Sequence, residues 1–219
     1  SFDRERLLVS NVYDLLGFSF DPLSESKLHQ CIEALPIEAK VTHIGFMLSR
    51  PLEGIRLIIK KVPPQYIVHY LKKNGWTGTS TSFSRLIKKL SELVDSVALA
   101  IDVGKDIYPK IGLECSFSST FNQYRWQIFL DYLVEESICT RDQKSALLNW
   151  SGLIQKEDFP DLWPDELSFG DTFLGSKTLS VIWRRINHVK IVYEPKKPIA
   201  AKAYLAFGHT WIDSSQLNK

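Results

Sequence analysis

Three pairs of β-type segments, each joined by a short turn-type segment, most constrain the fold of this chain. The pairs are HIGFMLSR with IRLIIKKV (43–50 and 55–62), SVALAIDV with KIGLECSF (96–103 and 110–117), and HVKIVYE with AKAYLAFG (188–194 and 201–208). Gly and Pro residues lie in the connections, as they do in hairpin loops. Because strands that enter a sheet as hairpins pair in opposite directions, the sequence predicts an antiparallel sheet.

Amphipathic helices are predicted around these hairpins, because apolar residues recur there every three or four positions. The predicted helices cover 4–16, the segment after a capping Ser24, the segment between Pro64 and Asn74, 83–95, 122–137, the segment from Thr140 to Trp150, and 171–186. Thr140 and Gln143 have the spacing of a capping box. Residues 151–170, rich in Pro, Asp and Trp, are predicted to form a surface loop in which Trp163 is exposed.

The order of these segments predicts an α+β fold made of repeated helix–helix–hairpin units. The three hairpins are expected to begin near His43, Val97 and His188. Their antiparallel sheet is expected to curve into a full or partial barrel with the helices outside. The predicted organisation is one domain, 1–219, with a helical part at 1–40, the repeated units at 41–212 and a polar tail at 213–219.

Composition excludes several classes of function. The formal net charge of the 219 residues is only +2, whereas nucleic-acid binders usually concentrate basic residues. No apolar run approaches the roughly 20 residues of a membrane span. The three cysteines are widely spaced and the five histidines show no ligand spacing, so neither a disulfide framework nor a metal site is predicted. With no signal-type segment in SFDRERLLVS, the expected location is cytoplasmic.

Side chains two apart on a strand lie on the same face of a sheet, and this rule separates an apolar face from a charged one. The charged face is predicted to carry Arg56, Lys110, Glu114, Lys190, Lys202 and Tyr204, with Asp102 joining them. Two interpretations are open. The face either meets water, as in many antiparallel sheets, or lines a cavity where the cations bind an anionic group such as a phosphate ester.

Several of these strands resemble those of aromatic prenyltransferases of the αββα-barrel type. AKAYLAF, with Lys202 and Tyr204, is similar to the Lys-x-Tyr motif of that family, and HVKIVYE places Lys190 in a similar position. IRLIIK and KIGLECSF look like further strands facing the inside of such a barrel. The layout of IGFMLSRP, hairpin and IRLIIKKV also resembles the peptide-modifying branch of the family.

The resemblance implies a transferase that moves a prenyl group from an isoprenoid diphosphate to an aromatic or peptide acceptor, with Mg²⁺ as a candidate companion of the diphosphate. It implies that Arg56, Lys110, Lys190 and Lys202 bind the diphosphate. Tyr204 would shield the allylic cation. Glu114, or Asp102 in its place, would accept a proton from the acceptor.

The alternative is a non-catalytic accessory or scaffolding protein that binds a peptide or a partner enzyme, for example by adding a strand to an exposed sheet edge. This alternative predicts that Arg56, Lys190 and Lys202 are scattered and face solvent. The transferase hypothesis predicts that they converge on one concavity with Glu114. The sequence leaves the oligomeric state open.

Overall fold

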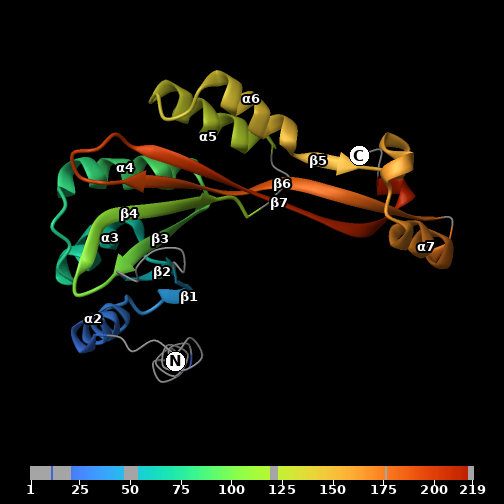
Figure 1. The fold of residues 1–219 in the computed structure, drawn as a ribbon. Helices are drawn as coiled ribbons and strands as arrows, with labels where there is room; N and C mark the ends of the chain where they lie inside the picture. Colours follow the sequence, from blue (N-terminus) through green and yellow to red (C-terminus); the bar gives the residue numbers. More distant parts are fainter. Residues whose placement is uncertain (1–10, 12–20, 47–53, 119–122, 176, 217–219) are drawn as a thin grey trace. The chain divides into compact units, whose positions relative to one another are not determined.

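The computed structural model describes residues 11, 21–46, 54–118, 123–175 and 177–216, and these form a mixed α+β structure (Figure 1). The helices of this part are α2 (Pro22–Glu33), α3 (Pro64–Lys73), α4 (Ser80–Leu93), α5 (Gln123–Glu135), α6 (Arg141–Trp150) and α7 (Asp165–Leu174). The strands are β1 (Lys40–Gly45), β2 (Ile55–Lys60), β3 (Ser96–Val103), β4 (Ile107–Ser116), β5 (Gly152–Ile154), β6 (Thr178–Tyr193) and β7 (Ala200–Asp213).

The predicted antiparallel sheet is confirmed. Its strand order is β1-β2-β3-β4-β6-β5, and β7 pairs with β6. The pairings of β1 with β2, β2 with β3, β3 with β4, β4 with β6 and β5 with β6 are all antiparallel. The sheet curls, but a full barrel is not confirmed.

The chain divides into two compact units. Unit 1 comprises Ser1–Ser118 and Val189–Lys202, and unit 2 comprises Ser119–His188 and Ala203–Lys219. Strands β6 and β7 contribute residues to both units. The β6–β7 hairpin runs through both units. The division into units therefore neither supports nor contradicts the predicted single domain.

The core of unit 1 lies between one face of the sheet and helices α3 and α4. Alternate strand residues are buried on this helical face, and they form rows across the strands: Leu57, Ile101, Ile111 and Tyr193 in one, and Ile59, Leu99, Leu113 and Ile191 in the next. Phe83 of α4 packs against the ring of Tyr193 with centroids 4.6 Å apart. Helix α2 joins this core, since the hydroxyl of Tyr70 on α3 donates to the carbonyl of Cys31 at 2.9 Å.

Unit 2 contains helices α5, α6 and α7. The predicted apolar stripe of α5 is buried, and its members are Trp126, Phe129, Leu130 and Leu133. The predicted capping box of α6 is confirmed, because the hydroxyl of Thr140 accepts from the Gln143 amide and the Gln143 side chain accepts from the Thr140 amide. Lys144 of α6 forms an ion pair with Asp131 of α5, so the two helices are also joined through their polar sides.

The segment 151–186 differs most from its prediction. The expected loop at 151–170 contains β5, two short 3-10 helices and the start of α7. The expected helix at 171–186 is wrong, since α7 ends at Leu174 and β6 begins at Thr178. Trp163 is buried, not exposed, and its indole N–H donates to the hydroxyl of Ser180 at 3.1 Å. The third hairpin therefore begins ten residues before His188.

Smaller corrections concern the repetition and the ends of the elements. The repetition of helix–helix–hairpin units is not confirmed, because β5 and α7 interrupt the third unit. Ser24 lies inside α2 and is buried, while Asp21 precedes the helix without a capping side-chain bond. The polar tail begins later than expected, since β7 continues to Asp213 and a 3-10 turn covers Ser214–Gln216. The predicted helix at 4–16 falls almost wholly outside the described residues.

Candidate functional site

The sheet face opposite the helical face carries four charged side chains from four strands of unit 1. Arg56 of β2 lies opposite Asp102 of β3, and Glu114 of β4 lies opposite Lys190 of β6. Each alternates along its strand with residues of the buried core, as the period of two in a strand requires. We call these four residues the charged cluster.

Arg56 and Asp102 form a two-point ion pair. The Nε atom of Arg56 donates to Oδ1 of Asp102 at 2.7 Å, and its Nη2 atom donates to Oδ2 at 2.8 Å. Both side chains remain partly exposed. Since the planar guanidinium matches the two oxygens of a carboxylate, this pair fixes the orientation of both groups.

Lys190 and Glu114 form a second, more buried pair. The ammonium nitrogen of Lys190 lies 3.4 Å from Oε1 of Glu114, and the two side chains are 10% and 16% exposed. Small residues on this face make room for the lysine. Its side chain passes over Gly112, where an added Cβ would lie 3.0 Å from Nζ and would overlap Cε. Ala98 and Ala100 are buried on β3 nearby, together with Ile58 of β2.

The pKa of Lys190 is lowered, chiefly because burial disfavours its charged form. The nearby Glu114 carboxylate opposes this shift, and the positive charge of Arg56 adds to it. The cluster as a whole contains two cations and two carboxylates, so its formal charges cancel. An anionic ligand would therefore have to compete with Asp102 and Glu114 for the two cations.

The other three predicted site residues are exposed. Lys110 lies on β4, and Lys202 and Tyr204 lie on β7. The ring of Tyr204 stacks on that of His188, with centroids 4.3 Å apart and an angle of 16° between the planes. The structure thus brings together Arg56, Asp102, Glu114 and Lys190, whereas Lys110, Lys202 and Tyr204 are exposed side chains of β4 and β7.

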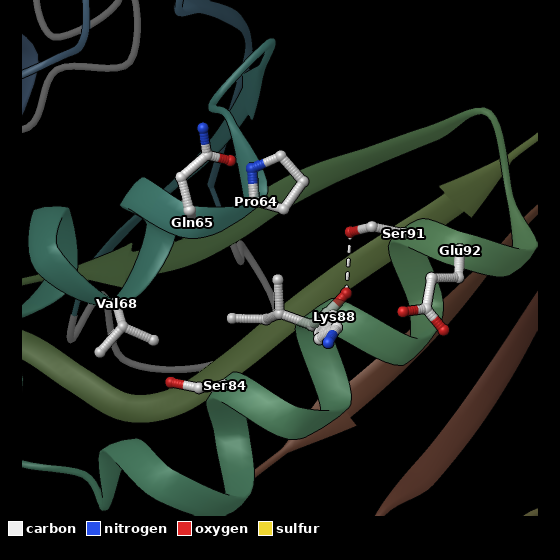
Figure 2. Close-up of a pocket in the computed structure, with 8 residues that line it drawn as sticks. Pro64, Gln65, Val68, Ser84, Lys88, Ser91 and Glu92 are labelled. Carbon is white, nitrogen blue, oxygen red and sulfur yellow. Dashed lines mark hydrogen bonds between the residues drawn. The ribbon is translucent and has the colours of Figure 1, made fainter.

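A groove between α3 and α4 is a site that sequence reasoning missed (Figure 2). Its volume is about 350 Å³. It is lined by Pro64, Gln65 and Val68 of α3 and by Ser84, Ile87, Lys88, Ser91 and Glu92 of α4. The hydroxyl of Ser91 donates to the carbonyl of Ile87 at 2.8 Å, so this hydroxyl is bonded within its own helix (Figure 2). The groove is therefore mainly an apolar hollow, with Lys88 and Glu92 as its charged groups.

Most of the large apolar side chains that are exposed in the described part of the chain belong to unit 2. Among the described residues fourteen such side chains are exposed, and eleven of them belong to unit 2. Those eleven are Tyr124, Ile128, Leu153, Phe159, Leu162, Phe169, Phe173, Leu174, Tyr204, Leu205 and Phe207. Sequence reasoning missed this surface because it assigned a helix to 171–186 and a loop to 151–170.

Within the residues that the structure describes, no group of three or more His, Cys, Asp or Glu side chains is arranged to hold a metal ion. In the same residues no helix is long and apolar enough to cross a membrane. Comparisons of the chain with protein-family models, curated proteins and solved structures found no match. The resemblance to prenyltransferases therefore stays a hypothesis.

Proposed function

We propose that this chain is a non-catalytic accessory protein whose unit 2 binds a segment of a partner protein. The observation that carries the proposal is the concentration of exposed large apolar side chains in unit 2. Burying one such side chain is worth roughly 1.5–3 kcal/mol. Exposed apolar side chains that gather in one part of a soluble protein often mark an interaction site.

The edge of β7 supports the same proposal. This strand has 14 residues and pairs with β6, and no other strand of the described part pairs with it. An open edge offers unpaired N–H and C=O groups to an extended peptide. Tyr204, Leu205 and Phe207 are exposed along it, so a peptide added there would meet apolar side chains on both faces.

Prenyl transfer is the second candidate function, and the position of Arg56 and Lys190 on one face of a curled sheet favours it. In that reaction the two residues would bind the diphosphate with Lys110 and Lys202, with Mg²⁺ as a candidate companion of the ligand. Glu114 or Asp102 would accept the proton of the acceptor, and Tyr204 would shield the allylic cation. Prenyl transfer ranks second because Arg56 and Lys190 are already paired with the carboxylates of Asp102 and Glu114.

A selection from a random-peptide library on the immobilised full chain tests the accessory function. The selected peptides are then mapped by hydrogen exchange, with the free chain as reference. We expect new protection within 123–188 and 203–216, since those residues carry the exposed apolar side chains. Protection confined to unit 1, or a selection that enriches no peptide, would contradict the proposal.

Calorimetry with an isoprenyl diphosphate analogue, with and without Mg²⁺, tests the second candidate. The wild-type chain is compared with Lys190→Met, which removes one proposed phosphate ligand. Saturable binding that weakens at least about tenfold in the variant would support prenyl transfer. Binding that is absent, or equal in both proteins, would remove its main support.

A further inference from the structure

Helix α7 is fixed to unit 2 along one side. Leu167 is buried on this side. Gly170 lies against the ring of Trp211 on β7, with ring carbon Cζ2 2.6 Å from the position of an added Cβ. Asp171 accepts from both the amide and the hydroxyl of Ser180, each at 2.6 Å. Positions 167, 170 and 171 follow helical spacing, so they define an inner side of the helix.

On the opposite side of α7, two aromatic side chains are exposed to solvent. Phe169 and Phe173 are one turn apart and are 74% and 81% exposed. Leu162, just before the helix, is 80% exposed. A helix on the surface of a globular protein normally turns its apolar stripe inward and its polar residues outward. Here Leu167, Gly170 and Asp171 already pack the inner side of α7 against unit 2. The two Phe rings therefore make no contribution to the packing that holds α7 in place.

The same segment is strongly acidic. Residues 155–175 contain six carboxylates and one basic residue, Lys156, in a chain whose net charge is +2. Asp158 and Asp171 are used in local hydrogen bonds. The other four, Glu157, Asp161, Asp165 and Glu166, are exposed, and their side chains bond to no residue of the described part. The helix dipole accounts for acidic residues in the first turn of α7, but it explains neither Glu157 and Asp161 nor the outward Phe rings.

We propose that the outer side of α7, with Phe169, Phe173, Asp165 and Glu166, binds a cationic amphipathic segment of a partner protein, next to the acidic segment that precedes the helix. The inference rests on the proposed accessory function and names the chemistry of its partner. Apolar side chains of the segment would cover the two Phe rings, and its Lys or Arg residues would meet the carboxylates. The negative charge disfavours an anionic membrane, a nucleic acid and a second copy of the same surface, since each would be repelled.

Two helical peptides with one apolar face and opposite charge test this inference on the full chain. Both carry Leu and Phe at helical spacing, and the polar face is Lys and Arg in one and Glu in the other. Fluorescence anisotropy gives their affinities. We expect the cationic peptide to bind at least about tenfold more tightly than the anionic one. This preference should shrink when ionic strength rises from about 0.05 M to about 0.5 M, because salt screens exposed charges.

Variants separate the apolar and the charged contributions. Phe169→Ser/Phe173→Ser should weaken the cationic peptide at least about tenfold. Asp165→Asn/Glu166→Gln should weaken it severalfold and reduce its salt dependence. Tyr66→Ser, at an exposed aromatic residue of α3 in unit 1, is the matched control and should bind as the wild type does. All of these substitutions are at exposed positions, and circular dichroism verifies that each variant folds.

The outcomes distinguish this inference from the proposed function. If library peptides protect unit 2 while the cationic probe binds no better than the anionic one, the partner chemistry is wrong and the accessory function stands. The same conclusion follows if Phe169→Ser/Phe173→Ser binds like Tyr66→Ser. If no peptide of any charge binds unit 2, both proposals fail.

Discussion

The side chain of Lys190 lies over Gly112, with its ammonium nitrogen 3.0 Å from where a β-carbon at position 112 would be. The same β-carbon would lie 3.1 Å from the Cβ of Ala100, so a larger residue has little room on this side as well. The glycine therefore allows a long cation from β6 to cross β4 and approach Glu114. Packing around one missing side chain thus positions the more buried ion pair of the charged cluster.

Gly112→Ala is expected to destabilise the protein by about 1 kcal/mol, because the added methyl group must push the end of the Lys190 side chain away from Glu114 and also comes within 3.1 Å of the Cβ of Ala100. Chemical denaturation measures the change. Gly45→Ala on β1 is the matched control, since among the described residues its Cβ would meet the Cβ of Arg56 at 3.5 Å, an ordinary contact. The control should be neutral or slightly stabilising. Equal effects of the two substitutions would show that Lys190 is not packed over Gly112.

The lowered pKa of Lys190 predicts a dependence of stability on pH. In the unfolded chain this lysine titrates near 10.5, whereas in the folded chain it loses its proton at lower pH. Between the two values the unfolded chain binds more protons, so the contribution of Lys190 to stability rises as pH increases through this window. Urea unfolding of the wild type and Lys190→Met should therefore show a gain of the wild type relative to the variant as pH approaches 10.5. A difference that stays constant with pH would contradict the lowered pKa.

Thiol labelling tests the core of unit 1. Burial raises the pKa of both Cys31 and Cys115 to about 12, from an ordinary value near 9.0. Both thiols are fully buried, while Cys139 is half-buried in unit 2. Since the thiolate is the reactive form, iodoacetamide at about pH 8 should modify Cys139 first and leave the other two until the chain unfolds. Mass spectrometry of the digested protein gives the order. Early modification of Cys115 would mean that β4 is not covered by the helices.

Gly170→Ala tests how closely α7 packs on β7. In the interior of an exposed helix this change normally stabilises by roughly 0.5–1 kcal/mol. Here we expect it to destabilise unit 2 instead, because the new methyl group would overlap the Trp211 ring. Thr172→Ala on the same helix is the control, since its hydroxyl only donates to the carbonyl of Ser168 and should matter little. Thermal unfolding shows whether each variant is more or less stable than the wild type. A stabilising effect of Gly170→Ala would contradict the contact between Gly170 and Trp211.

Short-range patterns predicted the strands whose two faces differ most. SVALAIDV forms β3 with the predicted bounds, and alternation correctly put Arg56, Asp102, Glu114 and Lys190 on one face. The neutralisation of the cations could not be predicted from alternation. It depends on the register between β2 and β3, which pairs Arg56 with Asp102, and on that between β4 and β6, which pairs Glu114 with Lys190 across 76 positions of the chain.

The error at 171–186 has a different cause. The apolar residues in this stretch are compatible with both a helix and a strand. The segment forms strand β6 because it pairs with β5 and β7, and sequence patterns do not predict such tertiary pairing. Helix α7 could have been found, because Pro164 followed by Asp165 and Glu166 is a helix-start signal. The exposure of Phe169 and Phe173 could not have been predicted, because it depends on which side of α7 contacts Trp211 and Ser180.

One calorimetric comparison tests the central claim, that unit 2 binds a protein segment and the charged cluster is not a diphosphate site. The full chain is titrated separately with the cationic amphipathic peptide and with an isoprenyl diphosphate analogue in the presence of Mg²⁺. We expect saturable binding of the peptide and no measurable heat with the diphosphate. Saturable diphosphate binding that Lys190→Met abolishes, together with no binding of the peptide, would contradict this claim.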